Sequence, residues 1–438
     1  MDPLIASAVI AVIMLLLLAS SLWVAASLVL VAIASMLMFS GAAVHLVMPS
    51  NIWGAVSSWT LTALPLFIWM GEILFRTRLA SDLFNGLSPW MNLLPGRLMH
   101  VNVVGCGIFS AVSGSSAATA ATVGRMSLPE LERRGYDSRL SIGSVAASGT
   151  LGLLIPPSII MIVYGVSANV SIARLFLAGV LPGLMIIGLF MAYIMVWSWF
   201  NKSKMPPADP PMPLWERIKR LRLIVPIVGL ILAVIGSIYG GFATATEAAT
   251  LGVVGSFIIA ALSGSLNWEN FKSSLIGATK TSCMIGFIIA AAAFLSVAMG
   301  YAGIPRGLAS WIGAMNLTAY QLIFALLILY LILGCFLDGI SMIVLTTAVI
   351  MPMVETVGID LIWFGIFIVL VVEMAQITPP VGFNLFVLQG LTGKSIFYVA
   401  RSVVPFFILM CLGTLLITLF PQIATWLPET MFTPAATR

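Results

Sequence analysis

Charged side chains are scarce in this 438-residue sequence: Asp, Glu, Lys and Arg make up 8% of it, against about 25% in a typical soluble domain. The 20 Lys and Arg and 15 Asp and Glu residues cannot cover the surface of a soluble fold, while 61% of the chain is hydrophobic. This balance excludes a soluble enzyme, a disordered protein and a nucleic-acid-binding protein. It predicts an all-α polytopic membrane protein embedded in a lipid bilayer.

Residues that carry chemistry are few as well. The two histidines, His45 and His100, stand far apart, and the sequence has neither a metal-ligand cluster nor a phosphate-binding Gly-Lys loop. We therefore expect neither an enzyme nor an ATP-driven pump, and no organic cofactor. The four cysteines all lie in apolar stretches without metal-binding spacing, which predicts buried structural thiols.

Long apolar runs fill most of the chain and leave room for roughly ten to a dozen spans of about 20 residues each. Two shorter stretches, 79–94 and 304–316, mix charged with apolar residues and are typical of amphipathic helices in the membrane interface. Segment 201–222 differs, because five prolines, Pro210 and Pro211 among them, precede a basic cluster. We interpret it as a solvated linker on the cytoplasmic side.

The two halves of the chain match each other at a spacing of 223 residues, which predicts a first repeat over 1–200 and a second over 223–438. The matches fall on proline, glycine and acidic residues, which are rare in such a composition. They pair Pro129, Glu132, Gly135, Asp137, Pro156, Pro157 and Pro182 with Pro352, Glu355, Gly358, Asp360, Pro379, Pro380 and Pro405.

The charges of one loop indicate how the repeats are oriented. Loop 125–139 carries four arginines and is basic. The residues 223 positions after these four arginines are uncharged, and the second loop is acidic. Basic loops remain in the cytoplasm, so we expect the first loop inside and its counterpart outside. The two repeats are then inverted, an architecture found in many secondary transporters.

One apolar run in each repeat is interrupted by small polar residues. The run 98–124 contains Ser113 to Ala117, and the run 319–351 contains Asp338, Gly339 and Ser341. A helical hairpin that enters the membrane and returns fits both, with its polar tip lining a cavity. The alternative for the first run is close packing of small residues between helices, and for Asp338 a helix cap without a ligand.

A second run in each repeat is broken by two prolines, which remove backbone donors and bend the preceding residue out of a helix. The broken helices are 139–169, with Pro156 and Pro157, and 361–392, with Pro379 and Pro380. The freed carbonyls need a cation or a neighbouring hydroxyl as partner. Paired breaks at matched positions predict the binding site.

Four motifs together resemble the large membrane subunit of tripartite ATP-independent periplasmic (TRAP) transporters, which is similar in fold to elevator-type ion transporters. The motifs occur in the family's order and cover nearly the whole chain. They are GSSAATA (114–120), IPPSIIMIVYG (155–165), DGISMIVL (338–345) and ITPPVGFNLFVLQG (377–390).

The resemblance implies a scaffold domain and a mobile transport domain in the bacterial inner membrane. It implies Na⁺-coupled import of an organic acid, such as a C4-dicarboxylate or a sialic acid, delivered by a periplasmic substrate-binding protein. A small membrane subunit of about four helices completes such complexes; we expect it as a separate chain, since no extra spans flank the motifs.

The resemblance also assigns residues to ligands. Na⁺ would be bound around the hairpin tips and breaks, by Ser113, Gly114, Ser115, Gly149, Thr150, Asp338, Gly339, Thr378 and Gly382. The small anionic substrate would meet Ser116, Ala117, Ser341, Asn384 and Arg125. Two other functions stay open at this point: a passive anion channel, and a carboxylate–sodium symporter that works without a binding protein.

Overall fold

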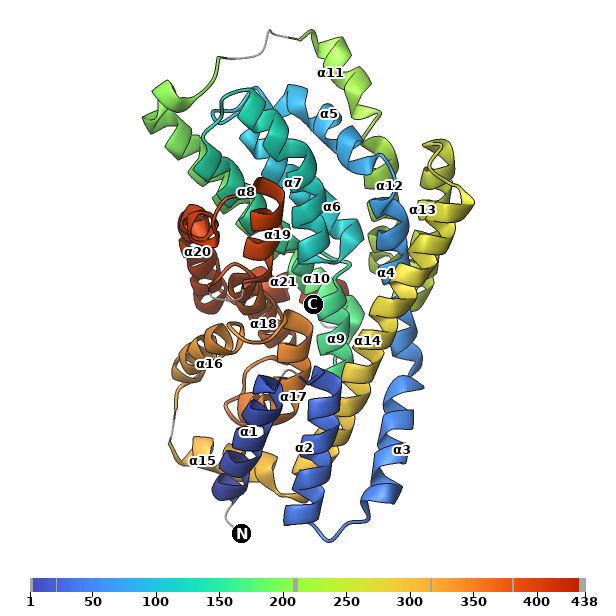
Figure 1. Ribbon diagram of the computed structural model, residues 1–438, viewed down its shortest axis with the longest axis vertical. Helices are drawn as coiled ribbons and strands as arrows, with labels where there is room; N and C mark the ends of the chain where they lie inside the picture. The colour runs from blue at the N-terminus through green and yellow to red at the C-terminus, as the bar shows by residue number, and fades with distance from the viewer. Residues whose placement is uncertain (1–2, 21, 208–211, 316, 380–381, 433–438) are drawn as a thin grey trace.

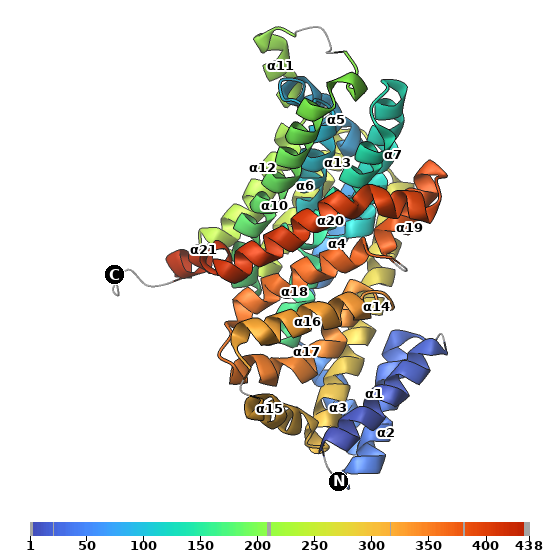
Figure 2. The same ribbon diagram turned by 90° about the vertical axis from the view of Figure 1, so that its left-hand side faces the viewer.

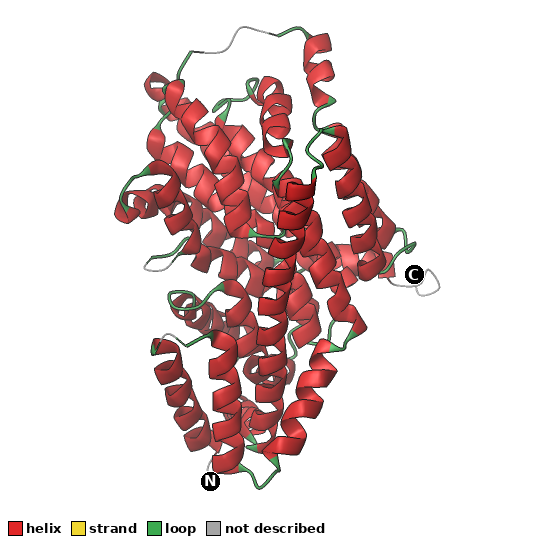
Figure 3. Cartoon of the chain, turned by 45° about the vertical axis from the view of Figure 1, so that its right-hand side comes forward, coloured by secondary structure: helices red, strands yellow, loops and turns green. Residues whose placement is uncertain are grey.

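The computed structural model describes residues 3–20, 22–207, 212–315, 317–379 and 382–432. All regular structure in these residues is helical, and they form no β-strand (Figures 1 and 3). Pro210, Pro211 and Pro380, which the sequence analysis singled out, lie outside the described residues.

The first half of the chain forms ten α-helices and two short 3₁₀ helices before the linker. They are α1 (Pro3–Ala19), α2 (Val24–Phe39), α3 (Val44–Val56), η1 (Trp59–Thr62), α4 (Ala63–Phe75), α5 (Leu79–Met91), α6 (Met99–Ser113), α7 (Ser116–Arg133), α8 (Ser138–Thr150), η2 (Leu151–Leu153), α9 (Ile159–Ser167) and α10 (Ile172–Phe200).

The linker and the second half supply the other described helices. They are η3 (Lys202–Lys204), α11 (Leu214–Leu221), α12 (Val225–Tyr239), α13 (Ala245–Leu262), α14 (Trp268–Tyr301), α15 (Ile304–Ala314), α16 (Ala319–Leu333), α17 (Gly339–Thr356), α18 (Leu361–Gln376), α19 (Phe383–Thr392), α20 (Ile396–Leu419) and α21 (Gln422–Phe432).

Helix boundaries recur at the spacing of 223 residues. Adding 223 to the bounds of α7, 116–133, gives 339–356, the bounds of α17. The same shift brings α8 onto α18, α9 onto α19 and α5 onto α15 within a few residues. One difference stands out: α3 and α4 are bent by 51° at η1, whereas their counterpart α14 is continuous over 34 residues.

The helices pack in two groups. In each group, a helix of the first half packs on one of the second half, and the counterparts of these two helices pack on each other in the same way. In one group, α2 packs on α14 and α13 on α4. In the other, α7 packs on α19 and α17 on α9, so each half contributes to the surroundings of the other's hairpin. Figures 1 and 2 show α5 and α11 at one end of the molecule and α15 at the opposite end.

Several predicted spans are divided in the structure. Among the described residues, five helices are long and apolar enough to cross a membrane, or up to seven if each of two bent pairs counts as one span. Most of the other apolar helices have 10–17 residues. Part of the shortfall from ten to a dozen spans arises because runs interrupted by polar residues or prolines each form two helices. The rest includes α1 and α2, which are undivided but have only 17 and 16 residues.

One expectation needs correction. The cysteines are not uniformly buried: Cys106 is buried, Cys335 and Cys411 are half-buried and Cys283 is exposed. The linker contains α11, an amphipathic helix without buried residues that packs on α5. Its exposed Trp215 is typical of a helix lying in a membrane interface.

Candidate functional site at the hairpin tips

The tip of the first hairpin, α6–α7, is a dense group of oxygen atoms. Gly114 ends α6 with a φ of 57°, a left-handed conformation that favours glycine. Ser115 then caps α7, its hydroxyl accepting the Ala118 N–H at 3.4 Å. Across the tip, Ser113 Oγ and Thr119 Oγ1 lie 2.6 Å apart, and Thr119 Oγ1 also donates to the Ser115 carbonyl at 2.8 Å.

A side chain from the other half of the chain fastens this tip. Ser116 Oγ donates to Asn384 Oδ1 at 2.9 Å, and Asn384 Nδ2 donates to the Ala146 carbonyl at 3.1 Å. Ser116 is 5% exposed and Asn384 is fully buried. Asn384 therefore joins α7 and α8 of the first half to α19 of the second.

In the first break, residues 151–158, the carbonyl that the prolines leave free accepts a hydrogen bond from a side chain of the break itself. Ser158 Oγ donates to the Leu153 carbonyl and accepts the Met161 N–H at 3.3 Å, which caps α9. Thr150 Oγ1 similarly donates to the Ala147 carbonyl at 2.8 Å. Of the two partners predicted for carbonyls at the breaks, a neighbouring hydroxyl is the one present for Leu153.

The tip of the second hairpin, α16–α17, is centred on one carboxylate. Asp338 caps α17, accepting the N–H groups of Ile340 and Ser341 at 3.1 and 3.3 Å, and Ser341 Oγ also donates to it. Asp338 is exposed, whereas Ser341 is buried. The geometry is that of the helix cap considered as the alternative. It leaves Asp338 at the surface of the described structure rather than enclosed in its core.

The second break follows Gln376. As at the first break, a side-chain hydroxyl donates to a backbone carbonyl. Thr378 Oγ1 donates to the Met374 carbonyl at 2.6 Å, and the Gly382 N–H donates to the Thr378 carbonyl at 3.0 Å. Cys335, in the turn of the second hairpin, donates through Sγ to the Pro379 carbonyl at 3.6 Å. The second hairpin and the second break are therefore in direct contact.

Both hairpin tips meet the beginning of α9. A Cβ built on Gly114 would lie 3.2 Å from Ile159 and 3.4 Å from the Pro157 carbonyl. A Cβ built on Gly339 would lie 2.9 Å from Ile160 and 2.5 Å from Val372. The structure thus brings the two tips and the first break together around one helix start.

Arg125 stays apart from this site. It is exposed on α7, nine residues beyond Ser116, which corresponds to about 13 Å along the helix axis. Ala117 is only half-buried beside the tip. The structure therefore does not bring Arg125 to the tip residues with which the sequence analysis grouped it.

The structure adds residues that the sequence analysis did not single out. Thr119 is hydrogen-bonded within the first tip, and the Ala146 carbonyl accepts a hydrogen bond from Asn384 beside it. Neither residue stands out in a run of small residues. Glu373 is fully buried in α18, one turn before the second break. A lone acidic residue in an apolar run is the signal that would have revealed it.

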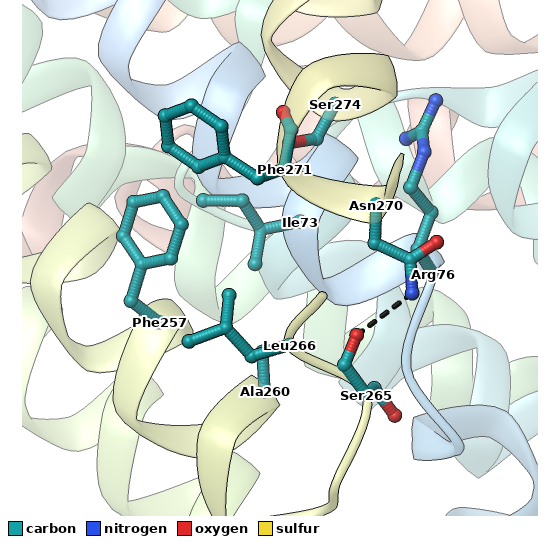
Figure 4. A pocket seen from close by; sticks show the side chains of 9 residues that line it. All are labelled: Ile73, Arg76, Phe257, Ala260, Ser265, Leu266, Asn270, Phe271 and Ser274. Atoms are coloured by element: carbon teal, nitrogen blue, oxygen red, sulfur yellow. Dashed lines mark hydrogen bonds between the residues drawn. The ribbon is translucent and has the colours of Figure 1, made fainter. Parts of the chain in front are cut away.

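A small pocket elsewhere does not compete with this site. It lies between α4, α13 and α14 (Figure 4), where Asn270 Nδ2 donates to the Ser265 carbonyl at 2.7 Å. Its volume of about 10 Å³ accommodates roughly one water molecule. It is far too small for an organic acid.

The loop between α7 and α8 holds an ion-pair network. Arg133 and Arg134 contact Glu130 at 2.7 and 2.6 Å. Partial burial opposes ionisation of Glu130, but the hydrogen bonds from Arg134 and Arg133 outweigh it and hold the pKa of the carboxyl below its usual value. Arg139 lies 5.5 Å from the centre of the Tyr398 ring, which connects this loop to α20.

Comparison with known proteins identifies the family. Residues 11–423 match the family described as "Tripartite ATP-independent periplasmic transporter, DctM component". The chain belongs to the TRAP transporter DctM family. The resemblance drawn from the four motifs is confirmed, and the chain is a multi-pass membrane protein of a transporter family.

TRAP large permease proteins share about 30% of their residues with this chain. The C4-dicarboxylate permease DctM of Pseudomonas aeruginosa is 32% identical over 85% of this chain and 86% of its own. The ectoine permease TeaC of Halomonas elongata is 30% identical over 90% and 92%. The isethionate permease DctMQ of Oleidesulfovibrio alaskensis is 32% identical over 84% of this chain but 58% of its own.

A solved transporter has a similar fold at low sequence identity. The YdaH transporter of Alcanivorax borkumensis superimposes with a TM-score of 0.65, covering 95% of this TRAP chain and 99% of its own, at 14% identity. At that identity the likeness concerns the fold alone. The prediction of an all-α transporter fold is confirmed.

Proposed function

We propose that this chain imports an organic acid, driven by the entry of Na⁺, after a periplasmic binding protein delivers the substrate. The observation that carries the proposal is the interlocked pair of hairpins and broken helices around α9. Polar tips and helix ends at a shared centre are the elements with which inverted-repeat transporters hold ions and substrates.

The first tip supplies a donor set suited to Na⁺. Ser113 Oγ, Thr119 Oγ1 and the Ser115 carbonyl lie close together, and oxygen ligands of this kind suit hard cations. Ser148, next to Gly149 on α8, adds a buried hydroxyl without a hydrogen-bond partner among the described residues. We assign one Na⁺ to this tip, with Gly114, Gly149 and Thr150 around it.

We assign a second Na⁺ to the second tip and the second break, around Asp338, Gly339, Thr378 and Gly382. The substrate carboxylate would approach Ser116, Ala117, Ser341 and Asn384. The N–H groups at the starts of α7 and α17 point to this region and favour negative charge. Arg125 would act on the path of the anion away from the tips.

The names of the relatives suggest which substrates to test. C4-dicarboxylate and isethionate permeases favour a small anion, while an ectoine permease shows that related chains also serve other solutes. We propose a C4-dicarboxylate first, with sialic acid, isethionate and ectoine as the comparison panel.

The proposed complex contains two partners in the bacterial inner membrane and the periplasm. One is a small membrane subunit of about four helices, and the other is the substrate-binding protein. The helices α6–α10 and α16–α21 would form the mobile transport domain. The helices α1–α5 and α12–α15 would form the scaffold against which it moves.

Uptake into proteoliposomes tests this function. The chain and its small subunit are reconstituted, the binding protein is added outside, and labelled solutes of the panel are offered with and without an inward Na⁺ gradient. Accumulation that requires both the gradient and the binding protein is expected. Downhill flux indifferent to both would favour an anion channel, and gradient-driven uptake without the binding protein would favour a simple symporter.

A further inference from the structure

Glu373 is a carboxyl group enclosed in the core of the helices that surround the hairpin tips. Its side chain has 0% exposure, and neither carboxylate oxygen has a hydrogen-bond partner among the described residues. A bare carboxylate in such surroundings is strongly disfavoured, because neither water nor an opposite charge stabilises it. The side chain is therefore a neutral carboxylic acid in this conformation.

The position of Glu373 is the crossing of the two broken helices. It lies on α18, one turn before the second break, and α18 packs on α8, η2 and α9 around the first break. The backbone N–H of Leu154 faces the carboxyl, but this N–H already donates to the Leu151 carbonyl at 3.1 Å. The Glu373 carboxyl therefore lies beside the first break, in the other half of the chain, and has no hydrogen-bond partner there among the described residues.

The equivalent residue in the first half is neutral. Subtracting 223 from 373 gives Thr150, whose hydroxyl donates to the Ala147 carbonyl of its own helix. A hydroxyl or an apolar side chain would fill this core position without an ionisable group. Packing therefore does not require a carboxyl at residue 373. Ionisable groups inside a membrane commonly serve transport.

Other titratable groups on the helices packed against α18 are engaged elsewhere or exposed. Tyr164 donates to the Leu361 carbonyl, Tyr330 contacts Thr346, and Cys411 contacts Met374. Tyr193 packs edge-on against Phe406. The remaining ones are exposed or half-buried residues at helix ends and surfaces: Asp137, Arg139, Arg174, Tyr320, Asp338, Glu355, Asp360, Tyr398, Arg401 and Glu429.

A metal ion does not fit around Glu373. A hard cation needs several oxygen ligands, and among the described residues no group of three or more His, Cys, Asp or Glu side chains could hold a metal ion with Glu373. A proton needs one oxygen atom and neutralises the carboxylate completely. The surroundings of Glu373 therefore select a proton over Na⁺.

We propose that Glu373 binds and releases a proton in each transport cycle, so that a proton accompanies the organic acid. This inference rests on the proposed transport function and adds a second coupling ion to it. On one side of the membrane the Glu373 carboxylate takes a proton from hydronium, which leaves water. On the other side the O–H bond breaks, the electron pair stays on the carboxylate, and the proton passes to water.

Proton exchange requires movement, because Glu373 has no contact with water in this conformation. The second hairpin tip covers α18 beside it, with Gly339 packed on Val372 and close to Gln376. Separation of this tip, or of the first break, from α18 would admit water. Protonation and the conformational change are then linked, as coupled transport demands.

The test compares the wild-type complex with Glu373→Gln, which mimics the neutral acid, and with Glu355→Gln, an exposed carboxyl on α17 as control. Proteoliposomes that enclose a pH-sensitive dye receive succinate with its binding protein, and uptake is followed at several pH values. We expect wild type and the control to acidify the lumen with uptake. On one limb of the profile their rate should change about tenfold per pH unit, as a single titrating site requires.

Glu373→Gln should abolish succinate-dependent acidification and flatten the pH profile. Acidification and a pH profile unchanged by Glu373→Gln would overturn the proposal, while Na⁺-dependent uptake in the same assay would leave the proposed function intact. Conversely, uptake that ignores Na⁺ but loses its proton signal in Glu373→Gln would refute Na⁺ coupling and support this inference.

A second measurement decides the case in which Glu373→Gln does not transport. Thermal unfolding of the purified complexes is recorded from pH 6 to 9, where Glu373 is ionised in the unfolded chain but keeps its proton in the core of the fold. Wild type and Glu355→Gln should lose stability with rising pH relative to Glu373→Gln. Parallel unfolding curves for the three proteins would refute the inference without reference to activity.

Discussion

The two hairpin tips hold matched positions in the chain but differ in chemistry. The first has four hydroxyl side chains, Ser113, Ser115, Ser116 and Thr119, and its fastening hydrogen bond comes from Asn384 in the other half. In the second, the residues 223 positions later are Phe336, Asp338, Gly339 and Met342. Its hydrogen bonds at Asp338 stay within its own helix start.

This difference shows that a repeated backbone does not impose a repeated site. The first tip is tied to both halves by hydroxyl and amide hydrogen bonds. The second rests on apolar contacts with α9 and α18 and on one weak thiol hydrogen bond, from Cys335 to the Pro379 carbonyl. We infer that the second tip separates from its neighbours more easily, since fewer directional contacts must break. The predictions that follow test this asymmetry.

The largest effect is expected from Asn384→Ala. The substitution leaves the Ser116 hydroxyl buried without its partner, which costs about 1–3 kcal/mol. It also removes the bond from Asn384 to the Ala146 carbonyl, which itself stays within α8. Na⁺-dependent uptake should fall far below wild type, and the melting temperature should drop. The control is Met161→Leu at the matched position of the first half, where the apolar side chain packs beside Gly179. If Met161→Leu impaired uptake as severely, the asymmetry between α19 and α9 would be refuted.

A smaller pair of effects concerns the glycines beside each tip. A Cβ on Gly149 would lie 2.6 Å from Ala120 Cβ and 3.0 Å from its Cα, so backbone must shift. A Cβ on Gly339 would meet Val372 Cγ1 and Ile160 Cδ1, which are side-chain atoms. Overpacking costs about 1–3 kcal/mol, and we expect Gly149→Ala near the upper limit and Gly339→Ala near the lower. Melting temperatures of the two purified variants check the order, and a reversed order would contradict it.

The sequence predicted the framework of the fold well, because proline, glycine and charge act locally. The breaks at Pro156 and Pro379 and the polar tips near Gly114 and Gly339 lie where the pattern put them. The sequence could not reveal which side chains of one half form hydrogen bonds with side chains of the other half. The contact between Ser116 and Asn384 joins residues 268 positions apart, and only the packing of α7 on α19 brings them together.

The burial of single residues escaped the pattern for a related reason. Asp338 is a lone carboxyl in an apolar run, yet it lies at an exposed helix start. Glu373, in a similar run, is the carboxyl that is truly buried. Hydropathy averages over a span and does not distinguish the inner face of a helix from its open end.

The caps of the two hairpins should differ in strength. Asp338 accepts two backbone N–H groups and one hydroxyl, while Ser115 accepts one N–H at 3.4 Å. Removing an N-cap costs about 0.5–2 kcal/mol, so Asp338→Ala should destabilise the complex more than Ser115→Ala. Thermal unfolding in Na⁺-free buffer isolates the cap from any ion, and Asp338→Asn should restore most of the loss. Equal losses for the two alanine variants would count against the comparison.

The smallest effect belongs to the loops that follow the hairpins. Arg133 and Arg134 lower the pKa of Glu130 in the first loop, and the matched positions in the second, Thr356 and Val357, offer no such partner. A lowered folded-state pKa contributes stability above the unfolded value of 4.5, and this contribution disappears as the pH falls through the folded value. The pair is largely solvated, so the loss should stay below about 1 kcal/mol. Melting temperatures from pH 6 down to pH 3 should therefore converge for wild type and Glu130→Gln. A gap between wild type and Glu130→Gln that persists at pH 3 would mean that Glu130 acts through packing rather than charge, and the two loops would then differ in shape alone.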